Sequence, residues 1–301
     1  MRTEVGRFLT TGWGKRGMLK PALTIGQQIN LLQNRGMIID DLEETKRFLE
    51  ETNYYRLNIY FHKLMITSDK FPNDVRFEKI IQYYKNDSLL RNSLLRLLEP
   101  IEIKIKTHFA YYLSIKYGSD CFYNNSLYKS EKIQNEIIEK FYSEVRRNKN
   151  DPVIQHHKQK YEGVFPIWVI VEYLSFNSLS KAFNNLNEFD KKQIANNAFQ
   201  INEYYLGQWL HVLSVLRNIC AHYGYLFRRD FSLRPTLYDD FGWNKKQNTK
   251  LFVMTLVIKR LSDEGIWSDF LSLFNDYIDM NSFFVLKDYG FPDDWILYLN
   301  N

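Results

Sequence analysis

The chain of 301 residues is long enough for one large domain or two small ones, and its 45% of hydrophobic and 16% of aromatic residues predict a sizeable buried core. Its net charge of +5 is unevenly spread: residues 263–301 hold eight acidic residues and one lysine, which leaves +12 on residues 1–262. The two cysteines, Cys121 and Cys220, have a spacing that fits no redox or metal motif, and the longest apolar run is too short to span a membrane.

We therefore expect a cytoplasmic protein without a signal peptide or a membrane anchor. The basic body predicts a polyanionic partner, most often nucleic acid, although a solvated lysine-rich surface has the same charge. No cofactor and no metal are expected, because the histidines lack cysteine or carboxylate neighbours at the spacing of a ligand set.

Residues 1–22 are expected to form a basic arm before the first helix. They contain four glycines and five basic residues, with Glu4 as the one acidic residue. This composition is typical of a flexible segment, or of one that becomes ordered on a partner. The candidate RNA contacts in the arm are Lys15, Arg16 and Lys20.

Apolar residues then recur at helical spacing. The sequence T-x-x-Q from Thr24 to Gln27 predicts a capping box at the start of the first helix, and Asp40 or Asp41 caps the next. The aromatic run 53–65 alternates like a strand, but we interpret it as a helix because helices flank it. Two more helices are predicted at about 77–84 and 89–117, and the second contains Pro100, which should kink or split it.

The second half of the chain continues the helical pattern. A loop over 118–130 is followed by a helix at about 131–147 and a polar, basic connection over 146–163, whose Arg146 and Arg147 are candidate RNA contacts. Pro166 suits the first turn of the next helix. Asp190, with Gln193, is expected to cap a short helix.

A further helix is expected over about 203–224, and two more helical patterns lie between 248 and 276. Strand-like alternation and hairpin turns are rare, so the predicted class is all-α. We expect a single helical domain over 23–262, with 146–163 as the best candidate for an internal boundary, followed by an acidic helical tail over 263–301.

The stretch LRNICAHYGYLFRRD, residues 216–230, places polar residues in the apolar pattern of the helix at 203–224. Asn218 and His222 are four residues apart and therefore share a helical face, which the long side chain of Arg217 can also reach. An apolar stripe occupies the other side of the helix: Leu210, Leu213, Leu216 and Cys220.

Arginine, asparagine and histidine together suit chemistry on a phosphodiester. Histidine can take a proton from a ribose 2′-hydroxyl or give one to a leaving 5′-oxygen. Arginine offers a bidentate fork to phosphate oxygens, and asparagine can orient either group. No carboxylate cluster lies nearby in the sequence, which argues against a two-metal nuclease. Such a site would act on RNA, because its nucleophile is the 2′-hydroxyl.

The spacing by itself also fits an ordinary helix end. In that interpretation His222 and Arg228 complement the helix dipole and Gly224 terminates the helix. Judged from spacing alone, this structural interpretation is favoured over the catalytic one.

The order of the residue types in the motif favours the catalytic interpretation. RNICAH resembles the R-N-x-x-A-H signature of the HEPN superfamily, in the form found in Abi-like abortive-infection proteins, and Arg228 and Arg229 stand in the place of the basic tail of that motif. The resemblance extends over roughly residues 20–235. Its other parts are LTIGQQINLLQNRGMIIDD, FLEETNYYRLNIY, FEKIIQYYKNDSLLRNSLLRLLEPIEIKIKTHFAYYLSIKYG and WVIVEYLSFNSLSKAFNNL.

The chain departs from the family pattern at Tyr223, Tyr225 and Arg228, where relatives often have histidine, arginine and asparagine. The departures concern details of substrate contact more than Arg217 and His222. The resemblance implies a helical bundle with a HEPN-like core, phage defence, RNA as substrate or ligand, and metal-free cleavage. Because HEPN sites usually form between two motifs and this chain has one, the resemblance also implies a homodimer.

Two functions remain open on these grounds. The first is a metal-independent endoribonuclease that uses Arg217, Asn218 and His222. The alternative is a non-catalytic HEPN-fold protein that holds a structured small RNA on its basic body; a helical protein-interaction module fits the charge less well. Four other histidines are interpreted as packed or merely exposed: His108, His156, His157 and His211.

Overall fold

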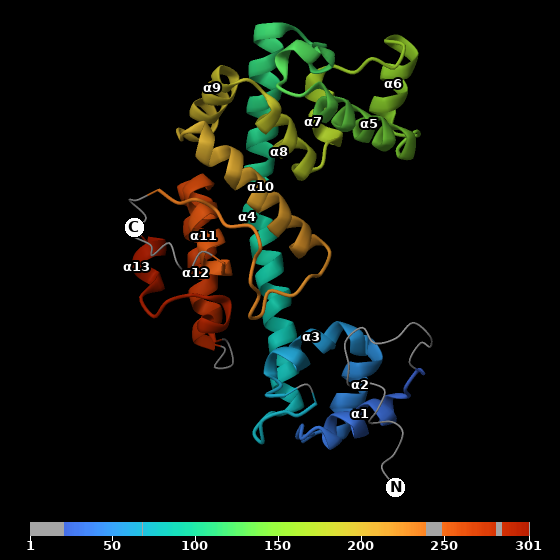
Figure 1. Cartoon of the computed structure of the whole chain (residues 1–301), viewed down its shortest axis with the longest axis vertical. Coiled ribbons are helices and arrows are strands. Elements are labelled where there is room, and N and C mark those ends of the chain that lie inside the picture. Colours follow the sequence, from blue (N-terminus) through green and yellow to red (C-terminus); the bar gives the residue numbers. More distant parts are fainter. Residues whose placement is uncertain (1–20, 68, 239–248, 281–284, 301) are drawn as a thin grey trace.

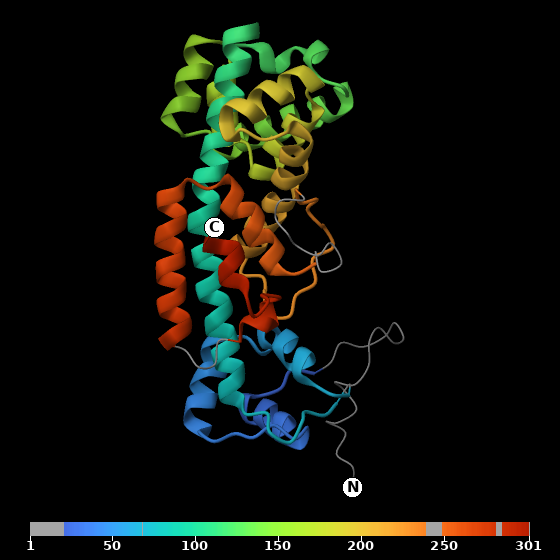
Figure 2. The same cartoon turned by 90° about the vertical axis from the view of Figure 1, so that its left-hand side faces the viewer.

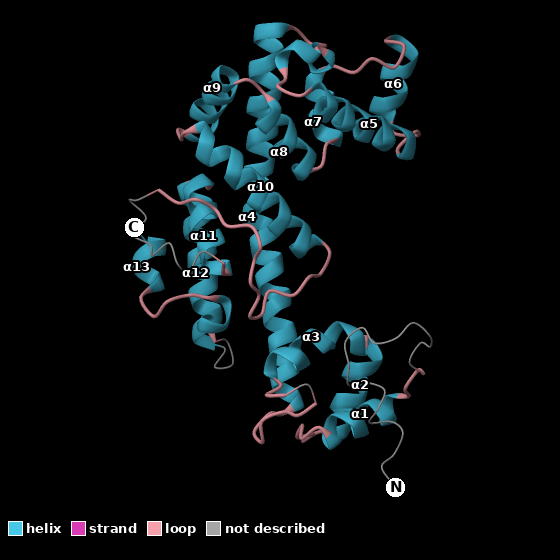
Figure 3. Ribbon diagram, viewed as in Figure 1, coloured by secondary structure: helices cyan, strands magenta, loops and turns pink. Residues whose placement is uncertain are grey.

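The computed structural model describes residues 21–67, 69–238, 249–280 and 285–300. These residues form helices joined by turns and loops, with no β-strand among them (Figure 3), so the predicted all-α class is confirmed. The predicted basic arm, including Lys15, Arg16 and Lys20, lies outside the described residues except for its last two positions.

Helix α4 (Phe77–Tyr117) runs without interruption along the molecule and forms its central axis (Figures 1 and 2). The predictions that 77–84 and 89–117 are separate helices and that Pro100 splits the second are therefore wrong. Pro100 removes the hydrogen bond to the Arg96 carbonyl, at a cost of roughly 3 kcal/mol. The neighbouring Leu97, Leu98 and Ile101 are buried, and each such side chain contributes about 1.5–3 kcal/mol. Packing thus outweighs the missing bond.

The other helices pack around successive parts of α4 (Figure 1). Those beside its N-terminal half are α1 (Ile25–Asn34), α2 (Leu42–Glu51) and α3 (Tyr54–Leu64). Those around its C-terminal half are α5 (Glu131–Arg147), α6 (Pro152–Lys160), α7 (Ile167–Tyr173), α8 (Phe176–Asn185) and α9 (Glu188–Phe199). Those beside its middle are α10 (Glu203–Ala221), α11 (Leu251–Leu261), α12 (Glu264–Met280) and α13 (Trp295–Asn300).

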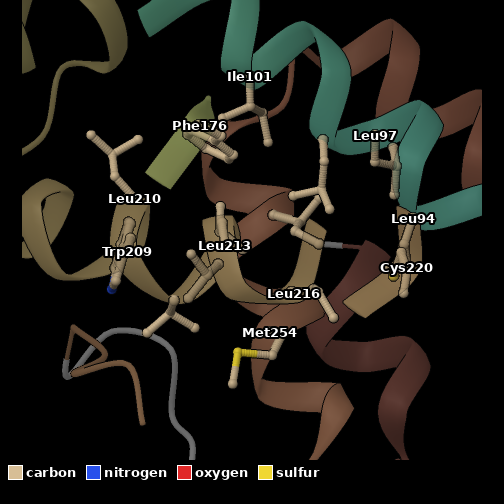
Figure 4. Packing of buried hydrophobic residues seen from close by; sticks show 14 of the residues in the cluster. Leu94, Leu97, Ile101, Phe176, Trp209, Leu210, Leu213, Leu216, Cys220 and Met254 are labelled. Atoms are coloured by element: carbon tan, nitrogen blue, oxygen red, sulfur yellow. The ribbon is translucent and has the colours of Figure 1, made fainter. Parts of the chain in front are cut away.

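Helix α10 crosses α4 and is buried along most of its length (Figure 4). Its predicted apolar stripe faces the core, and Leu213, Leu216 and Cys220 have 2% exposure or less. This packing fixes the direction of the helix and therefore the place where its C-terminal end emerges. The neighbours labelled around the stripe come from three other helices: Leu94, Leu97 and Ile101 of α4, Phe176 of α8 and Met254 of α11.

Local capping signals are confirmed where the structure describes them. Thr24 and Gln27 form both hydrogen bonds of the capping box at α1, and the Asp41 side chain accepts from the backbone of Glu44 at α2. The aromatic run at 53–65 is a helix, as predicted, with Asn53 as its N-cap. Each of these signals depends on residues within one helical turn, which is why the sequence reveals them.

The segment 146–163 is not the plain connection that we expected from its polar composition. It contains α6, which Asp151 caps and Pro152 begins. Ile154 is fully buried in the common core, and His157 stacks on Phe165 with ring centroids 5.2 Å apart. A helix forms here because one apolar side and a good cap are sufficient when a core is available to receive them.

The acidic C-terminal region packs into the same core as the rest of the chain. Trp267 and Phe274 of α12 and Trp295 of α13 are buried in it. The short 3₁₀-helix η6 (Leu286–Tyr289) places Tyr289 in contact with α4. Among the described residues, no helix combines the length and the apolar character that crossing a membrane requires.

Asp190 lies inside α9 and not at its N-terminus. The prediction that it caps this helix is wrong, because Asn187 is the cap and accepts a hydrogen bond from the Asp190 backbone (2.9 Å). The buried Asp190 carboxylate instead accepts hydrogen bonds from α4: from Lys116 (2.7 Å), Tyr112 (2.8 Å) and Tyr117 (2.9 Å). It ties α9 to the C-terminal end of the central helix.

We expect the stability of the fold to decrease in acid, because the charge of the Asp190 carboxylate contributes to it. Burial alone would raise the pKa of this carboxyl, but the hydrogen bonds from Lys116, Tyr112 and Tyr117 outweigh it, and the pKa lies below its ordinary value. A lowered pKa stabilises the fold above the pKa of the unfolded chain, about 3.9, and this stabilisation is lost as the pH falls below that value.

Asp190→Asn should lower the free energy of unfolding by about 1.5–3 kcal/mol at neutral pH. The difference from the wild-type protein should shrink on acidification to about pH 3, because the Asp190 carboxyl of the unfolded wild-type chain takes up a proton near its ordinary pKa of about 3.9 while the folded carboxyl resists protonation. Urea unfolding of both proteins at the two pH values measures the difference. A difference that does not change with pH would contradict this role of the carboxylate.

Candidate functional site

The motif of residues 217–222 lies at the C-terminal end of α10. The helix ends at Ala221, with His222 as its C-cap, earlier than the predicted end at residue 224. The backbone N–H of Gly224 donates to the Ile219 carbonyl (2.7 Å) and that of Tyr223 donates to the Cys220 carbonyl (3.2 Å). These two bonds define a Schellman motif, which satisfies the last carbonyls of the helix.

The residue in the left-handed conformation of this turn is Tyr223, with φ of 59°, and not Gly224. Gly224 is needed for a different reason, because a Cβ atom there would lie 2.8 Å from Cγ2 of Ile219. A tyrosine in the left-handed region costs energy that a glycine would avoid. The turn thus holds an aromatic side chain directly beside His222, at some cost to stability.

Arg217 is held by α4. Its Nε atom lies 3.5 Å from Oε2 of Glu102, and its Nη1 atom donates to Oδ1 of Asn218 (3.3 Å). The other carboxylate oxygen of Glu102 lies 3.4 Å from Nζ of Lys106. The Arg217 side chain is about a third exposed (35%), so its guanidinium is partly fixed by Glu102 and partly open to a ligand.

His222 is exposed and lines a cleft of about 530 Å³ between α3 and the turn after α10. Arg217 and Asn218 are not among the residues that line this cleft. The structure therefore brings Arg217 and Asn218 together, as expected, but it places His222 on a cleft that those two do not line. One copy of the chain does not gather the three predicted residues around one cleft.

The chain after the turn is fixed by Asp87, a fully buried residue of α4. Its carboxylate accepts hydrogen bonds from the Leu226 backbone (2.7 Å), from the Tyr60 hydroxyl (2.7 Å) and from the Tyr289 hydroxyl (3.0 Å). Arg91 lies 4.0 Å from the same carboxylate and donates to the Gly224 carbonyl (3.2 Å). Elements from four parts of the chain thus meet at the residues that follow His222.

The surroundings of Asp87 keep its partners as hydrogen-bond donors. Burial and the nearby carboxylate raise the pKa of Tyr60 and of Tyr289 well above the ordinary value. Burial also raises the pKa of Asp87, and the hydrogen bonds that it accepts oppose this rise. The roles of Asp87 and Glu102 are not predicted from the sequence. The one sign of them in the sequence is a charged residue at a position where helical spacing predicts a buried apolar residue.

Arg228 and Arg229, two predicted RNA contacts, already have partners within the chain. Arg228 donates from Nε to Asp288 (2.6 Å) and from Nη1 to the Lys63 carbonyl (3.1 Å). Arg229 donates to the Tyr225 carbonyl (3.2 Å), and its guanidinium lies 4.6 Å from the centre of the Tyr225 ring. These contacts favour a role in holding the turn, and a phosphate would have to compete with the ion pair of Arg228.

Arg146 and Arg147 are exposed at the C-terminal end of α5, in the upper part of Figure 1, whereas the end of α10 lies near the middle. Arg147 lies 2.7 Å from Glu144 of the same helix. The exposed Lys158 and Lys160 of the neighbouring α6 extend the positive charge. We call this group of four residues the α5–α6 basic surface.

His108, His156, His157 and His211 are not among the residues that line the cleft beside His222, whereas His62 of α3 is. His157 is buried, and its Nδ1 atom lies 2.8 Å from the Val153 carbonyl, while His156 is exposed. Burial and the charge of Lys104 lower the pKa of His108. Within the described part of the chain, no three His, Cys, Asp or Glu side chains are grouped so that they could hold a metal ion.

Fold and site together define an all-helical protein that presents an R-N-x-x-A-H motif at the C-terminal end of the buried helix α10, with His222 beside a cleft. A family model, described as Abi-like protein, matches residues 47–228, which is more than half of the chain, and the protein belongs to this family. The matched segment runs from α2 to Arg228 and includes α3, α4 and α10. Comparisons with curated proteins and with solved structures find no match.

Membership of the Abi-like family indicates a role in abortive infection, which is a form of phage defence. Helices α11, α12 and α13 follow the matched segment. This later part of the chain nevertheless supplies Tyr289 to Asp87 and Asp288 to Arg228. It therefore supports the turn that follows the motif.

Proposed function

We propose that this Abi-like protein is a metal-independent endoribonuclease of the HEPN superfamily that acts in phage defence. His222 is the proton-transferring group, Arg217 stabilises the phosphate and Asn218 orients the reacting groups. The observation that carries the proposal is the position of His222. It is an exposed imidazole beside a cleft, and the turn that follows it is fixed from α4 by Asp87 and Arg91.

The reaction needs one base and one acid. The 2′-oxygen of a ribose attacks the adjacent phosphorus, and its proton passes to an imidazole. The bond between phosphorus and the 5′-oxygen of the next nucleotide breaks, and this oxygen takes a proton from the acid. The products carry a 2′,3′-cyclic phosphate and a 5′-hydroxyl. The charge that builds on the phosphate oxygens faces a guanidinium fork.

A homodimer is part of the proposal, because each chain supplies one motif and because Arg217 does not line the cleft of His222 in its own chain. An exposed apolar stripe on α4 offers a surface for a second copy. It begins at Ile103, next to Glu102, and continues through Tyr111 and Ile115, which are 55%, 68% and 73% exposed. Exposed apolar residues that are grouped in this way commonly mark a protein–protein interface.

Tyr111→Glu with Ile115→Glu should halve the mass of the particle in solution and abolish RNA cleavage. Both side chains are exposed, so the substitutions leave the core intact, while two buried negative charges oppose association. Light scattering checks the mass. Ile66→Glu, at an exposed isoleucine outside α4, is the control and should change neither quantity. A wild-type protein that is monomeric at working concentration would contradict the dimer.

The α5–α6 basic surface is proposed as an RNA-binding surface. Arg146→Ala with Arg147→Ala should weaken RNA binding and make it less sensitive to salt. For single-stranded RNA, the slope of log affinity against log salt should change by about 0.7 for each phosphate that is no longer neutralised, or roughly 1.4 for two. Arg47→Ala, at an exposed arginine of α2, should leave the slope unchanged. An unchanged slope in the double variant would remove this surface from the proposal.

The function itself is tested with the purified protein, RNA copurified from its host and an excess of chelator. We expect internal cleavage that persists in the chelator and gives 2′,3′-cyclic phosphate ends. Tight RNA binding without any cleavage would instead favour the alternative, a non-catalytic RNA-binding protein. Cleavage that stops in chelator would contradict a metal-independent mechanism.

A further inference from the structure

The cleft beside His222 has the composition of a nucleotide-binding site. Its lining contains five tyrosines, two asparagines, two histidines and one arginine, and no acidic residue. Its volume of about 530 Å³ lies within the range of roughly 300–1,000 Å³ that small-molecule sites occupy. A lining without carboxylates accepts a phosphate without charge repulsion, while the aromatic rings offer flat apolar surface.

Two of the tyrosines present their rings to solvent. Tyr55 of α3 is 84% exposed and Tyr223 is 67% exposed, so neither contributes much to the core. Tyr223 also occupies the left-handed conformation, with φ of 59°, which is energetically costly for a residue that has a Cβ atom. An exposed ring that is kept in place at such a cost is better explained by a ligand than by folding.

Arg56 of α3 fixes the position of Tyr223. Its Nη1 atom donates to the Tyr223 carbonyl (3.4 Å), and its guanidinium lies 5.6 Å from the centre of the Tyr223 ring. Arg56 is itself exposed, so it retains donors for a further acceptor. The ring and the cation thus lie on one edge of the cleft, next to His222.

We propose that this cleft binds an unpaired nucleobase of RNA, which stacks on Tyr55 and Tyr223 while Arg56 contacts the adjoining phosphate. Aromatic and guanidinium planes stack on bases, and the amides of Asn53 and Asn58 can hydrogen-bond to base edges. The inference rests on the proposed function and deepens it. The base held here would place the neighbouring phosphate at His222, so the cleft would determine which nucleotide is cut.

The test measures the affinity of the full-length chain for a short, fluorescently labelled single-stranded RNA of mixed sequence, in a His222→Ala background that prevents cleavage. Loss of one stacked base costs about 1–3 kcal/mol, which corresponds to a loss of affinity of about 5- to 150-fold. We expect a loss of this size for Tyr55→Ala and for Tyr223→Gly. Tyr204→Ala, at a tyrosine of α10 that is 58% exposed, is the matched control and should bind as the background protein does.

Tyr223→Gly also guards against a folding artefact, because glycine relieves the left-handed strain and the melting temperature should not fall. A fully paired duplex of the same sequence should not respond to Tyr55→Ala, since its bases are already stacked. If the background protein binds single-stranded RNA and both tyrosine variants bind it equally well, the base site is wrong while the proposed function stands. If the background protein binds no RNA, both are overturned.

Discussion

His222→Ala should abolish RNA cleavage and toxicity toward the host cell while leaving the fold and the affinity for RNA nearly intact. General acid–base assistance contributes about 10²–10⁴-fold in rate, so the loss should be plain in a cleavage assay. The side chain is exposed at the cleft, and its removal opens no cavity in the core. Circular dichroism, an RNA-binding titration and a cleavage assay on one preparation check the three parts of the prediction.

The control is His156→Ala, at an exposed histidine of α6. It removes an equal amount of side chain far from the motif and should retain full activity. If His222 serves only as a helix cap, its replacement should lower the free energy of unfolding by roughly 0.3–1 kcal/mol and leave the chemistry unchanged. A destabilised but fully active His222→Ala variant would therefore assign the motif to the scaffold.

Asp87→Ala should cause the largest loss of stability among the variants considered. The substitution leaves the Tyr60 and Tyr289 hydroxyls and the Leu226 N–H buried without their acceptor, and it leaves Arg91 without its anion. Breaking a buried charged network of this kind costs about 3–5 kcal/mol. Because the network fixes the chain that follows His222, cleavage should also be lost. Urea unfolding and the cleavage assay measure the two effects.

Tyr289→Phe provides a graded comparison, since it removes one donor to Asp87 and keeps the ring. It should lower the free energy of unfolding by about 0.5–1.5 kcal/mol and leave cleavage largely unchanged. An Asp87→Ala variant that unfolds at the same urea concentration as the wild-type protein would show that the hydrogen bonds around Asp87 contribute little. The hydrogen bond from Tyr289 would then have no part in supporting the site.

The parts of the fold that the sequence predicts are those that depend on near neighbours. The capping box at Thr24, the Asp41 cap and the helix over the run 53–65 each follow from residues within one or two turns. The apolar stripe of α10 is equally local, since its period alone identifies the buried side. These features can be predicted from the sequence without knowing which residues they pack against.

The features that the sequence could not predict depend on packing between distant segments. The helix α4 continues past Pro100 because the buried residues on both sides hold it, and α6 forms because a core receives Ile154. Asp190 has the spacing of a cap, but its buried carboxylate accepts hydrogen bonds from three residues of α4. In each case, tertiary contacts outweigh a local preference.

The candidate site divides in the same way. Arg217, Asn218 and His222 are visible in the sequence as a motif. The sequence does not show that Arg217 pairs with Glu102 while His222 lines a separate cleft. The role of Asp87 is harder to predict from the sequence, because its partners Tyr60, Leu226 and Tyr289 are 27, 139 and 202 residues away. A polar residue at a buried helical position was the one available sign.

In the proposed mechanism, the nucleophile is the ribose 2′-hydroxyl and His222 moves its proton. A decisive substrate is an RNA in which the nucleotide on the 5′ side of a mapped cleavage site carries a 2′-deoxyribose. With the wild-type protein in excess chelator, we predict that cleavage at this bond disappears while cleavage at other sites continues. Undiminished cleavage at the deoxy position would mean that water attacks the phosphate, and it would contradict this mechanism.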